Sequence, residues 1–432
     1  MKAKKLQALE MMLRFMAIAV IKRHRPVIVG VTGSVGKSSA KEAIALVLGS
    51  KFQVRKNEEN YNNEVGIPLT IIGAKSGKHS FVGWLRVLMK WIDVVFFSAT
   101  YPEILVLELG IDRPGDMKYL LSFVPVRVGV MTNVSSSHLE FFQTVGAIAR
   151  EKGLLIKHLP ESGTAVLCAD DERTLRFASK TKAKVITFGL NESASIRADH
   201  IAFSGDADRF DGCHFKLSFD GKTIPVHLPH VIAEHHIQAV LSGIAVGRVF
   251  KLNPIAMAAA VQAFRSLPGR MQMLEGYKQS WIIDDTYNAS PVSLLAALKT
   301  LRVFSQGRRV VALGDMLELG DESEGAHTKV AGWVMEAGVD VAVLVGKRML
   351  AAHEVLIRNG FSKENCLWFV SPMEAAAVMR HHIETGDVVL VKGSQGMRME
   401  KVTESLLEHS EKATQLLCRQ SDDWKRIPFT IK

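Results

Sequence analysis

One segment near the N-terminus of this 432-residue chain limits its possible folds more than any other feature. Residues 26–31 (PVIVGV) form an apolar run typical of a buried parallel strand, and a helical pattern begins at about Gly36. The turn between them consists of Thr32, Gly33, Ser34, Val35, Gly36, Lys37, Ser38 and Ser39. Glycines let backbone N–H groups approach phosphate oxygens, and the helix N-terminus adds positive potential. The segment therefore predicts a phosphate-binding loop.

Two residues of this loop have expected roles in that chemistry. Lys37 would contact the β- and γ-phosphates of a nucleotide, and the Ser38 hydroxyl would bind Mg²⁺. The general pattern has a glycine five residues before Gly36, where this chain has Val31. The alternative is an ordinary glycine-rich turn, but the Gly-Lys-Ser core between a strand and a helix favours the phosphate loop.

Further apolar runs predict the rest of a parallel α/β sheet. Residues 104–109 and 128–131 are short strand candidates with helical patterns between and after them. From about residue 184 to 228 apolar and polar residues alternate in places, and Asp220-Gly221 is a hairpin signal. We expect a small antiparallel layer there, attached to the first domain, and then a helix over residues 234–249.

The alternation of strand and helix patterns restarts after Leu267-Pro268-Gly269, which marks a domain boundary. The new strand candidates are residues 281–285, 309–313, 339–345 and 387–391. They predict a second α/β domain of about 160 residues. The expected division is a basic helix over residues 1–25, a phosphate-loop ATPase domain over 26–267 and a Rossmann-like domain over 268–432.

The composition excludes some classes of function. Hydrophobic residues make up 47% of the chain and four scattered cysteines have no metal-ligand spacing, which fits a globular protein with reduced thiols. The net charge of +10 suits phosphate-rich substrates or an anionic membrane surface. No basic motif interleaved with aromatic residues accompanies it, so we expect no nucleic-acid binding.

The N-terminus does not read as an export signal. Residues 11–21 are apolar, but Arg14 interrupts them and the phosphate loop follows almost at once. No stretch reaches the length of a transmembrane helix. We therefore expect a cytoplasmic protein.

Polar residues stand where the predicted strands end. Glu108 ends one strand and could bind Mg²⁺, because parallel strands present ligands at their carboxyl ends. His138 follows the next strand, although lone histidines are usually structural. Asn62 and Asn63 lie in a polar turn that could bind substrate or be a plain loop. In the second domain Asp285, Tyr287 and Asn288 follow one strand and Lys392 and Ser394 follow another, whereas Arg270 lies at the boundary between the domains.

Six motifs in order resemble the Mur ligase family, over residues 27–404. They are TGSVGKSS, NYNNEVGIP, TNVSSSHLEFF, DDTYNASP, LGDMLELG and VKGS. The resemblance implies an ATP-dependent ligase that activates a carboxylate as an acyl-phosphate and joins it to an amine. It is strongest to the members that add D-alanyl-D-alanine to a UDP-N-acetylmuramoyl-tripeptide in peptidoglycan synthesis. The implied cofactors are ATP and Mg²⁺, and we expect a monomer.

The resemblance also implies roles for single residues. Lys37 would contact the phosphates, Ser38 and Glu108 would bind Mg²⁺, and His138 would bind a second metal ion. Lys152 matches the lysine that becomes a carbamate and thereby an oxygen ligand. Arg270 and Asp285 would hold the nucleotide. Substrate-facing positions would be Asn62, Asn63, Tyr287, Asn288, Lys392 and Ser394.

The chain departs from the family pattern in two places. His236 and Ala239 replace two asparagines beside the helix that borders adenine. Only about 25 residues precede the first strand, where typical members carry a domain that binds the UDP-sugar. A related ligase for another carboxylate, such as a folate-type polyglutamate acceptor, stays open. So does a nucleotide-binding protein that has lost ligation.

Two amphipathic helix candidates have no counterpart in the motifs. The first spans residues 1–25, and the second spans residues 81–97, where Arg86, Lys90 and Asp93 share one stripe of a helix. The two helices either pack on the first domain as core, or form a substrate platform or a contact with the inner membrane surface.

Overall fold

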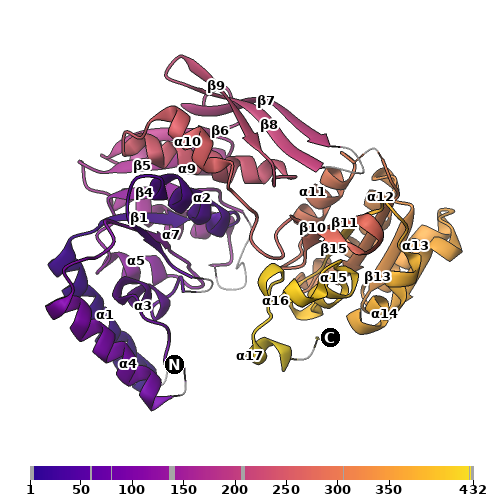
Figure 1. Ribbon diagram of the computed structural model, residues 1–432, viewed down its shortest axis with the longest axis horizontal. Coiled ribbons are helices and arrows are strands. Elements are labelled where there is room, and N and C mark those ends of the chain that lie inside the picture. The colour runs from indigo at the N-terminus through magenta and orange to yellow at the C-terminus, as the bar shows by residue number, and fades with distance from the viewer. Residues whose placement is uncertain are drawn as a thin grey trace. The chain divides into compact units, whose positions relative to one another are not determined.

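The computed structural model describes residues 4–58, 61–78, 80–135, 142–205, 210–304, 306–427 and 429. Two compact units divide the chain. The first contains residues up to Ile201 together with His214–His227 and Glu234–Phe264. The second contains Ala202–Cys213, Leu228–Ala233 and the chain from Arg265 onward. Each unit is built around one sheet (Figure 1).

The first sheet has nine strands in the order β2-β3-β1-β4-β5-β6-β7-β8-β9. The strands are β1 Val27–Thr32, β2 Val54–Lys56, β3 Ile104–Glu108, β4 Val128–Met131, β5 Thr164–Cys168, β6 Lys184–Gly189, β7 Ile196–Gly205, β8 Phe210–Phe219 and β9 Lys222–Leu228. All pairs from β2 through to β7 are parallel. The predicted parallel sheet is therefore confirmed, and β1 lies within it between β3 and β4.

The antiparallel part of this sheet is smaller than the sequence indicated. β6 pairs in parallel with β5, so the expectation that antiparallel pairing starts at about residue 184 was wrong. The chain reaches β6 through helical segments, and such a crossover brings a strand back in the same direction. The predicted hairpin is confirmed, because Asp220 and Gly221 have positive φ and connect β8 to β9, which extend the main sheet.

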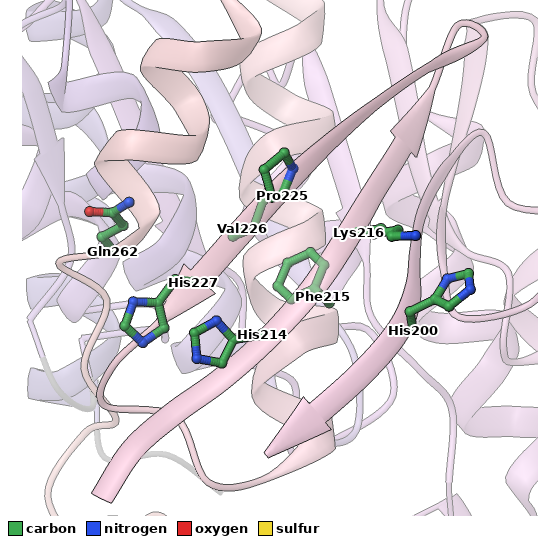
Figure 2. A pocket seen from close by; sticks show the side chains of 8 residues that line it. All are labelled: His200, His214, Phe215, Lys216, Pro225, Val226, His227 and Gln262. Carbon is green, nitrogen blue, oxygen red and sulfur yellow. The ribbon is translucent and has the colours of Figure 1, made fainter. Parts of the chain in front are cut away.

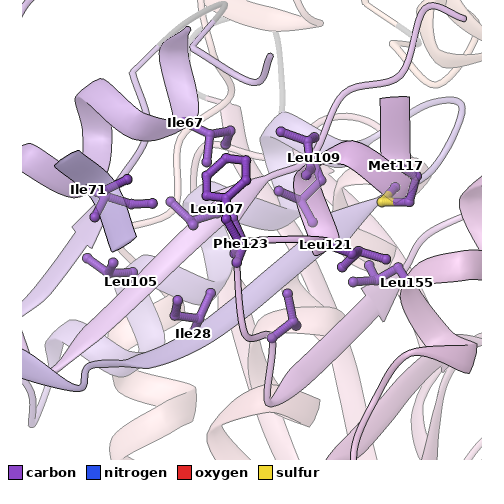
Figure 3. Close-up of a cluster of buried hydrophobic side chains, with 14 of the residues drawn as sticks. Ile28, Ile67, Ile71, Leu105, Leu107, Leu109, Met117, Leu121, Phe123 and Leu155 are labelled. Carbon is purple, nitrogen blue, oxygen red and sulfur yellow. The ribbon is translucent and has the colours of Figure 1, made fainter. Parts of the chain in front are cut away.

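Helices cover both faces of the first sheet. They are α1 Lys4–His24, α2 Lys37–Gly49, α3 Gly66–Ile72, α4 Phe81–Ile92, η1 Asp93–Phe97, α5 Asp116–Leu121, α7 Val145–Lys157, α8 Glu172–Leu175, η2 Ala178–Lys180, α9 Glu234–Val249 and α10 Pro254–Val261. Helix α9 packs against α2 on one face. On the other face Ile28 and Leu107 of the sheet meet Ile67, Met117 and Leu155 of α3, α5 and α7 (Figure 3).

The second unit has a six-stranded sheet in the order β10-β11-β15-β12-β13-β14. Its strands are β10 Gln272–Gly276, β11 Ser280–Asp285, β12 Arg309–Gly314, β13 Val341–Val345, β14 Cys366–Phe369 and β15 Val388–Lys392. Only β10 runs antiparallel to its neighbour. This open, mostly parallel sheet has the predicted Rossmann-like character.

Helices also cover both faces of the second sheet, with one apolar core on each face. The longer helices are α11 Pro291–Leu301, α12 Ser323–Glu336, α13 Met349–Arg358, α14 Pro372–His382 and α15 Glu400–Leu406. The shorter ones are η3 Tyr277–Gln279, η4 Gly320–Glu322, η5 Lys363–Asn365, η6 Gln395–Met397, η7 Ser410–Lys412, α16 Ala413–Leu416 and α17 Asp422–Lys425. Among the described residues, no helix has both the length and the apolar character that crossing a bilayer requires.

Candidate phosphate-binding site

The predicted phosphate loop joins the end of β1 to the start of α2, as expected. Gly36 is the N-cap of α2 and has φ +79°, a conformation that residues with a side chain rarely adopt. Gly33 approaches the next strand so closely that a Cβ atom there would collide with the Thr132 hydroxyl. Both glycines are therefore required by the backbone path, which turns the first N–H groups of α2 towards the carboxyl end of the sheet.

The segment after β4 holds this loop in place. The Val35 N–H donates to the Asn133 side chain over 2.8 Å, and the Thr132 hydroxyl donates to the Val35 carbonyl over 2.7 Å. Ser34 donates from its hydroxyl to the Ser135 carbonyl and accepts from the Ser135 N–H. The Thr-Asn pair that opens the TNVSSSHLEFF motif thus shapes the loop from the end of the neighbouring strand.

Lys37 lies half-buried at the start of α2 and folds back over the loop. Its ammonium group donates to the Gly33 carbonyl over 2.9 Å and to the Ser34 carbonyl over 3.4 Å. Thr32 and Ser39 are buried, and the Thr32 hydroxyl donates to the Leu109 carbonyl. These two residues support the loop from below, whereas the cation of Lys37 lies in the loop itself.

Glu108 lies at the carboxyl end of β3 beside this loop and is buried. Burial alone would raise its pKa, but Lys37, Lys41 and hydrogen bonds from Ser38 and Asn62 outweigh burial, and the pKa falls below its usual value. Glu108 is therefore ionised at neutral pH. An ionised carboxylate next to a serine hydroxyl offers hard oxygen ligands of the kind that Mg²⁺ prefers, so Ser38 and Glu108 fit the ion that the sequence predicted.

Two buried polar residues that the sequence did not single out position Glu108. The Glu108 N–H donates to the Asn57 side chain over 2.8 Å, and Lys41 donates to the Asn57 carbonyl over 2.7 Å. Asn57 and Lys41 are both almost fully buried. The only available signal was the spacing of Lys41, one helical turn after Lys37 on α2.

Lys152 lies on α7 with 1% of its surface exposed. Burial and the cation of Lys37 lower its pKa to about 7, although Asp112, Glu108 and Glu151 act in the opposite direction. Lys37 and Glu108 both act on the pKa of Lys152, so the three residues share one electrostatic environment. A lysine on a helix is normally solvated, but this side chain is inside the protein.

The remaining candidate residues of the first unit differ in their hydrogen-bond partners. The Asn62 amide donates to the Glu108 carboxylate over 3.2 Å, so it belongs to the same cluster. Asn63 accepts from the N–H groups of Val65 and Gly66 at the start of α3 and is explained by that turn. His138 lies outside the described residues.

The candidates of the second unit gather after β11 and β15. Lys392, at the end of β15, forms an ion pair with Asp285 at the end of β11, and it also donates to the Asn288 carbonyl over 3.0 Å. Arg270 stacks on the Tyr287 ring with its guanidinium carbon 4.0 Å from the ring centroid. Asn288 is exposed. These residues share one edge of the second sheet, as the strand ends predicted.

Two neighbours of this group are interior. Ser394 is buried and accepts from the Leu317 N–H over 2.8 Å. Asp284 is fully buried; burial raises its pKa to about 6, against hydrogen bonds from Thr286, Thr403 and the Gly269 N–H. Asp284 and Ser394 therefore hold the loops that carry Asp285 and Lys392. The substrate contact expected of Ser394 stays a prediction.

The helix that departs from the family pattern is α9. His236 and Ala239 lie in its first turns and are both buried, and the His236 ring meets the Phe264 ring at 6.0 Å. Gln238, in the same turns, is half-buried, and its amide donates to Asp170 over 2.8 Å. Positions 236 and 239 therefore face the protein interior, and neither carries a side-chain amide.

A pocket of about 450 Å³ lies on the strands of the hairpin, outside this cluster (Figure 2). Its lining includes His214 and His227, which stack face to face with ring centroids 4.1 Å apart. Lys216, Pro225 and Gln262 also line it. None of the residues that the sequence motifs identified lines it, so it has no part in the phosphate site.

The two units thus define a class of protein: an α/β domain with a phosphate loop, followed by a Rossmann-like domain. The family description "Mur ligase middle domain" matches residues 93–247, and "Mur ligase, glutamate ligase domain" matches residues 269–395. The UDP-N-acetylmuramoyl-tripeptide–D-alanyl-D-alanine ligase of Bacillus subtilis (strain 168) is 27% identical over 382 residues, covering 88% of this chain and 76% of that protein.

Solved structures show the same similarity. MurF ligase from Thermotoga maritima, in complex with ADP, superimposes with a TM-score of 0.73 and 26% identity, covering 94% of this chain and 84% of that chain. Folylpolyglutamate synthase from Mycobacterium tuberculosis, at 16% identity, covers 95% of this chain and 96% of that chain with a TM-score of 0.63, which shows a shared fold. The chain belongs to the Mur ligase family.

Proposed function

We propose that this protein is an ATP-dependent ligase that joins a carboxylate to an amine through an acyl-phosphate. The observation that carries the proposal is one cluster at the end of the first sheet. There Lys37 and Ser38 of the phosphate loop, ionised Glu108 and buried Lys152 share one electrostatic environment. A structural ion-pair network would not need a phosphate loop with glycines at these backbone positions.

In the proposed reaction the substrate carboxylate attacks the γ-phosphorus of ATP, giving an acyl-phosphate and ADP. The incoming amine then attacks the acyl carbon, and inorganic phosphate leaves with the former carboxylate oxygen. Catalysis of this kind depends on positioning and on neutralising negative charge. Lys37 and the N-terminus of α2 would do so at the phosphates, and Mg²⁺ held by Ser38 and Glu108 would stabilise charge on the transferring group.

Lys152 is proposed to act as a carbamate. With a pKa of about 7, much of the amine is uncharged near neutral pH and can attack CO₂. The product is a lysine carbamate, and one proton is released. The side chain thereby changes from a buried amine to a carboxylate-like group, which suits a second hard metal ion. We propose His138 as a further ligand of that ion.

The second unit is proposed to contribute Arg270 and Asp285 to nucleotide binding, and Tyr287, Asn288 and Lys392 to substrate binding. The ion pair between Lys392 and Asp285 would then open or be shared when a ligand arrives. Adenine recognition is proposed to rely on groups other than side-chain amides at positions 236 and 239.

The particular reaction we propose is that of the MurF type, which adds D-alanyl-D-alanine to a UDP-N-acetylmuramoyl-tripeptide. The similarity to named ligases of that type over 88% of the chain supports it. Peptidoglycan-precursor synthesis in the cytoplasm, by a monomer, is the setting that we propose. A folate-type polyglutamate acceptor is the alternative, supported by the fold shared with folylpolyglutamate synthase.

A phosphate-release screen tests these proposals. UDP-muramoyl peptides are supplied with ATP and Mg²⁺, and D-alanyl-D-alanine or single amino acids are added as the amine. We expect ADP, phosphate and the amide product in equal amounts only when the tripeptide and D-alanyl-D-alanine are both present. A folate acceptor with glutamate is the matched comparison. Release with that pair alone would move the proposal to the alternative ligase, and no release with any pair would leave a nucleotide-binding protein without ligation.

A further inference from the structure

Two adjacent helices of the first unit expose an unusual amount of apolar surface. We define the apolar patch as the exposed large hydrophobic residues of α1, α4 and η1. They are Leu6, Met11, Met12, Phe15, Phe81, Val82, Leu85, Leu88, Met89, Phe96 and Phe97. Among the described residues these are 11 of the 18 exposed large hydrophobic side chains, although the three elements form a small part of the chain. Phe81 is 83% exposed and Phe97 is 78% exposed.

The patch is continuous across the two helices, which lie side by side (Figure 1). The Trp91 indole of α4 donates to the Met16 carbonyl of α1 over 3.0 Å. Its ring lies 6.5 Å from the Phe15 ring and 6.2 Å from the Phe96 ring, measured between centroids. Trp91 thus joins the exposed side chains of α1 to those of α4 and η1.

The exposed apolar face is not a poorly packed core face. Leu13, Met16, Ala17 and Val20 of α1 are buried against the sheet domain, and Val87 and Val94 do the same for α4 and η1. The sequence offered core packing and surface contact as alternatives. Each helix in fact has an inner apolar face that packs and a second apolar face that does not.

The charge of the chain is concentrated beside this patch. Residues 1–25 and 75–97 contain eleven Lys and Arg but only two Asp and Glu, a net charge of +9. The rest of the chain contains 43 basic and 42 acidic residues, so these two segments account for nearly all of the total of +10. Lys22 and Arg23 of α1 and Arg86 of α4 are exposed, and the acidic Glu10 is buried.

We infer that α1, α4 and η1 form a docking surface for an anionic phospholipid bilayer. Helices with aromatic, Leu and Met side chains on one face and flanking Lys and Arg bind in the plane of a membrane interface, where apolar groups enter the headgroup boundary and cations meet anionic lipid. A second copy of the chain is a poor occupant, because the two segments that carry the patch have a net charge of +9 and would repel the same segments of another copy. The inference concerns a surface separate from the phosphate site and does not depend on the proposed reaction.

Cosedimentation of the full-length protein with lipid vesicles tests the inference. The vesicles contain phosphatidylglycerol and phosphatidylethanolamine in one arm and phosphatidylcholine alone in the other. We expect binding to the anionic vesicles, weaker binding to the neutral ones, and a loss of at least tenfold in the partition coefficient between 50 and 300 mM salt, as rough expectations for an electrostatic contribution. Absence of binding to the anionic vesicles would overturn the inference.

Matched variants distinguish binding through the patch from nonspecific adsorption to the vesicles. The apolar variant carries Met11→Ser, Phe15→Ser and Met89→Ser, and its control carries Ile255→Ser, Val292→Ser and Val303→Ser, which are also exposed. The charge variant carries Lys22→Gln, Arg23→Gln and Arg86→Gln. Its control carries Lys182→Gln, Lys222→Gln and Lys363→Gln, which are exposed elsewhere.

We expect each patch variant to lose about tenfold in vesicle binding and each control to stay within about twofold of the wild type, following the expected cost of surface changes. Equal losses in controls and patch variants would refute a specific surface. Light scattering without lipid checks the other occupant: a dimer that the apolar variant abolishes would show that a second copy covers the patch. ATP-dependent phosphate release without vesicles, measured on every variant, reports separately on the proposed ligase.

Discussion

Replacing Lys152 by methionine should make the protein more stable while removing its proposed activity. Methionine has a similar length and no charge, so it fills the space of a side chain that is 1% exposed without leaving a buried ammonium group. Most substitutions of buried residues destabilise a protein. The opposite is expected here because the native environment opposes the charged form of this lysine.

The size of the effect follows from linkage between protonation and folding. Burial and Lys37 lower the pKa of Lys152 from 10.5 to about 7, and each pKa unit corresponds to about 1.4 kcal/mol, so the cost in the folded state reaches roughly 5 kcal/mol. Between pH 7 and 10.5 the unfolded chain holds a proton that the folded chain has released. The free energy of unfolding of the wild type therefore rises with pH in this window, and the cost is complete below about pH 7.

The free energy of unfolding of Lys152→Met should accordingly exceed that of the wild type by several kcal/mol at pH 7 and by about 2 kcal/mol at pH 9. Urea denaturation of the full-length protein, monitored by circular dichroism in CO₂-free buffer without Mg²⁺, measures this difference in the free energy of unfolding. Lys157→Met, on an exposed position of the same helix, is the matched control and should change stability by less than about 0.5 kcal/mol. If Lys152→Met is less stable than the wild type at both pH values, the lysine is stabilised by its partners and the reasoning fails.

Three further outcomes follow from the site. Lys37→Ala should abolish ATP turnover with an unchanged circular dichroism spectrum, and turnover at the wild-type rate would remove Lys37 from the mechanism. Gly36→Ala should cost about 1–2 kcal/mol of stability because φ is +79°, whereas the control Gly49→Ala in α2 should be neutral or stabilising, which thermal melts can compare. Without amides at 236 and 239, kcat/KM for GTP should approach that for ATP more closely than amide-based recognition would allow, and a very large ATP preference would show that other groups read adenine.

Local patterns predicted the parts of the fold that depend on short segments. The loop after β1, the start of α2 and the strand of Val128–Met131 were all read from a few adjacent residues. The carboxyl ends of parallel strands meet at one edge, so the grouping of Glu108 with Lys37 was also predictable. These features follow from spacing and chain direction alone.

Features that depend on long-range packing could not be predicted in the same way. Asn57 looks like any polar loop residue in the sequence, yet it is buried because it satisfies the backbone of Glu108, 51 residues later. Lys184–Gly189 pairs in parallel because of where its crossover places it, which no alternation pattern reveals. The burial of Lys152 on α7 was likewise invisible, because a helix lysine is normally exposed.

The charges at the phosphate site relate the stability cost of the buried Lys152 to its proposed function. Lys37, Lys41 and Lys152 all influence the site around the one buried carboxylate of Glu108, either directly or through one another. Burial is the larger cause of the depressed pKa of Lys152 and the cation of Lys37 adds to it, while Asp112, Glu108 and Glu151 oppose both. A polyphosphate would neutralise the cation of Lys37 at the loop, and conversion of Lys152 to a carbamate would add an anion able to hold a metal ion. The same burial that opposes the charged form of Lys152 therefore prepares this lysine for modification.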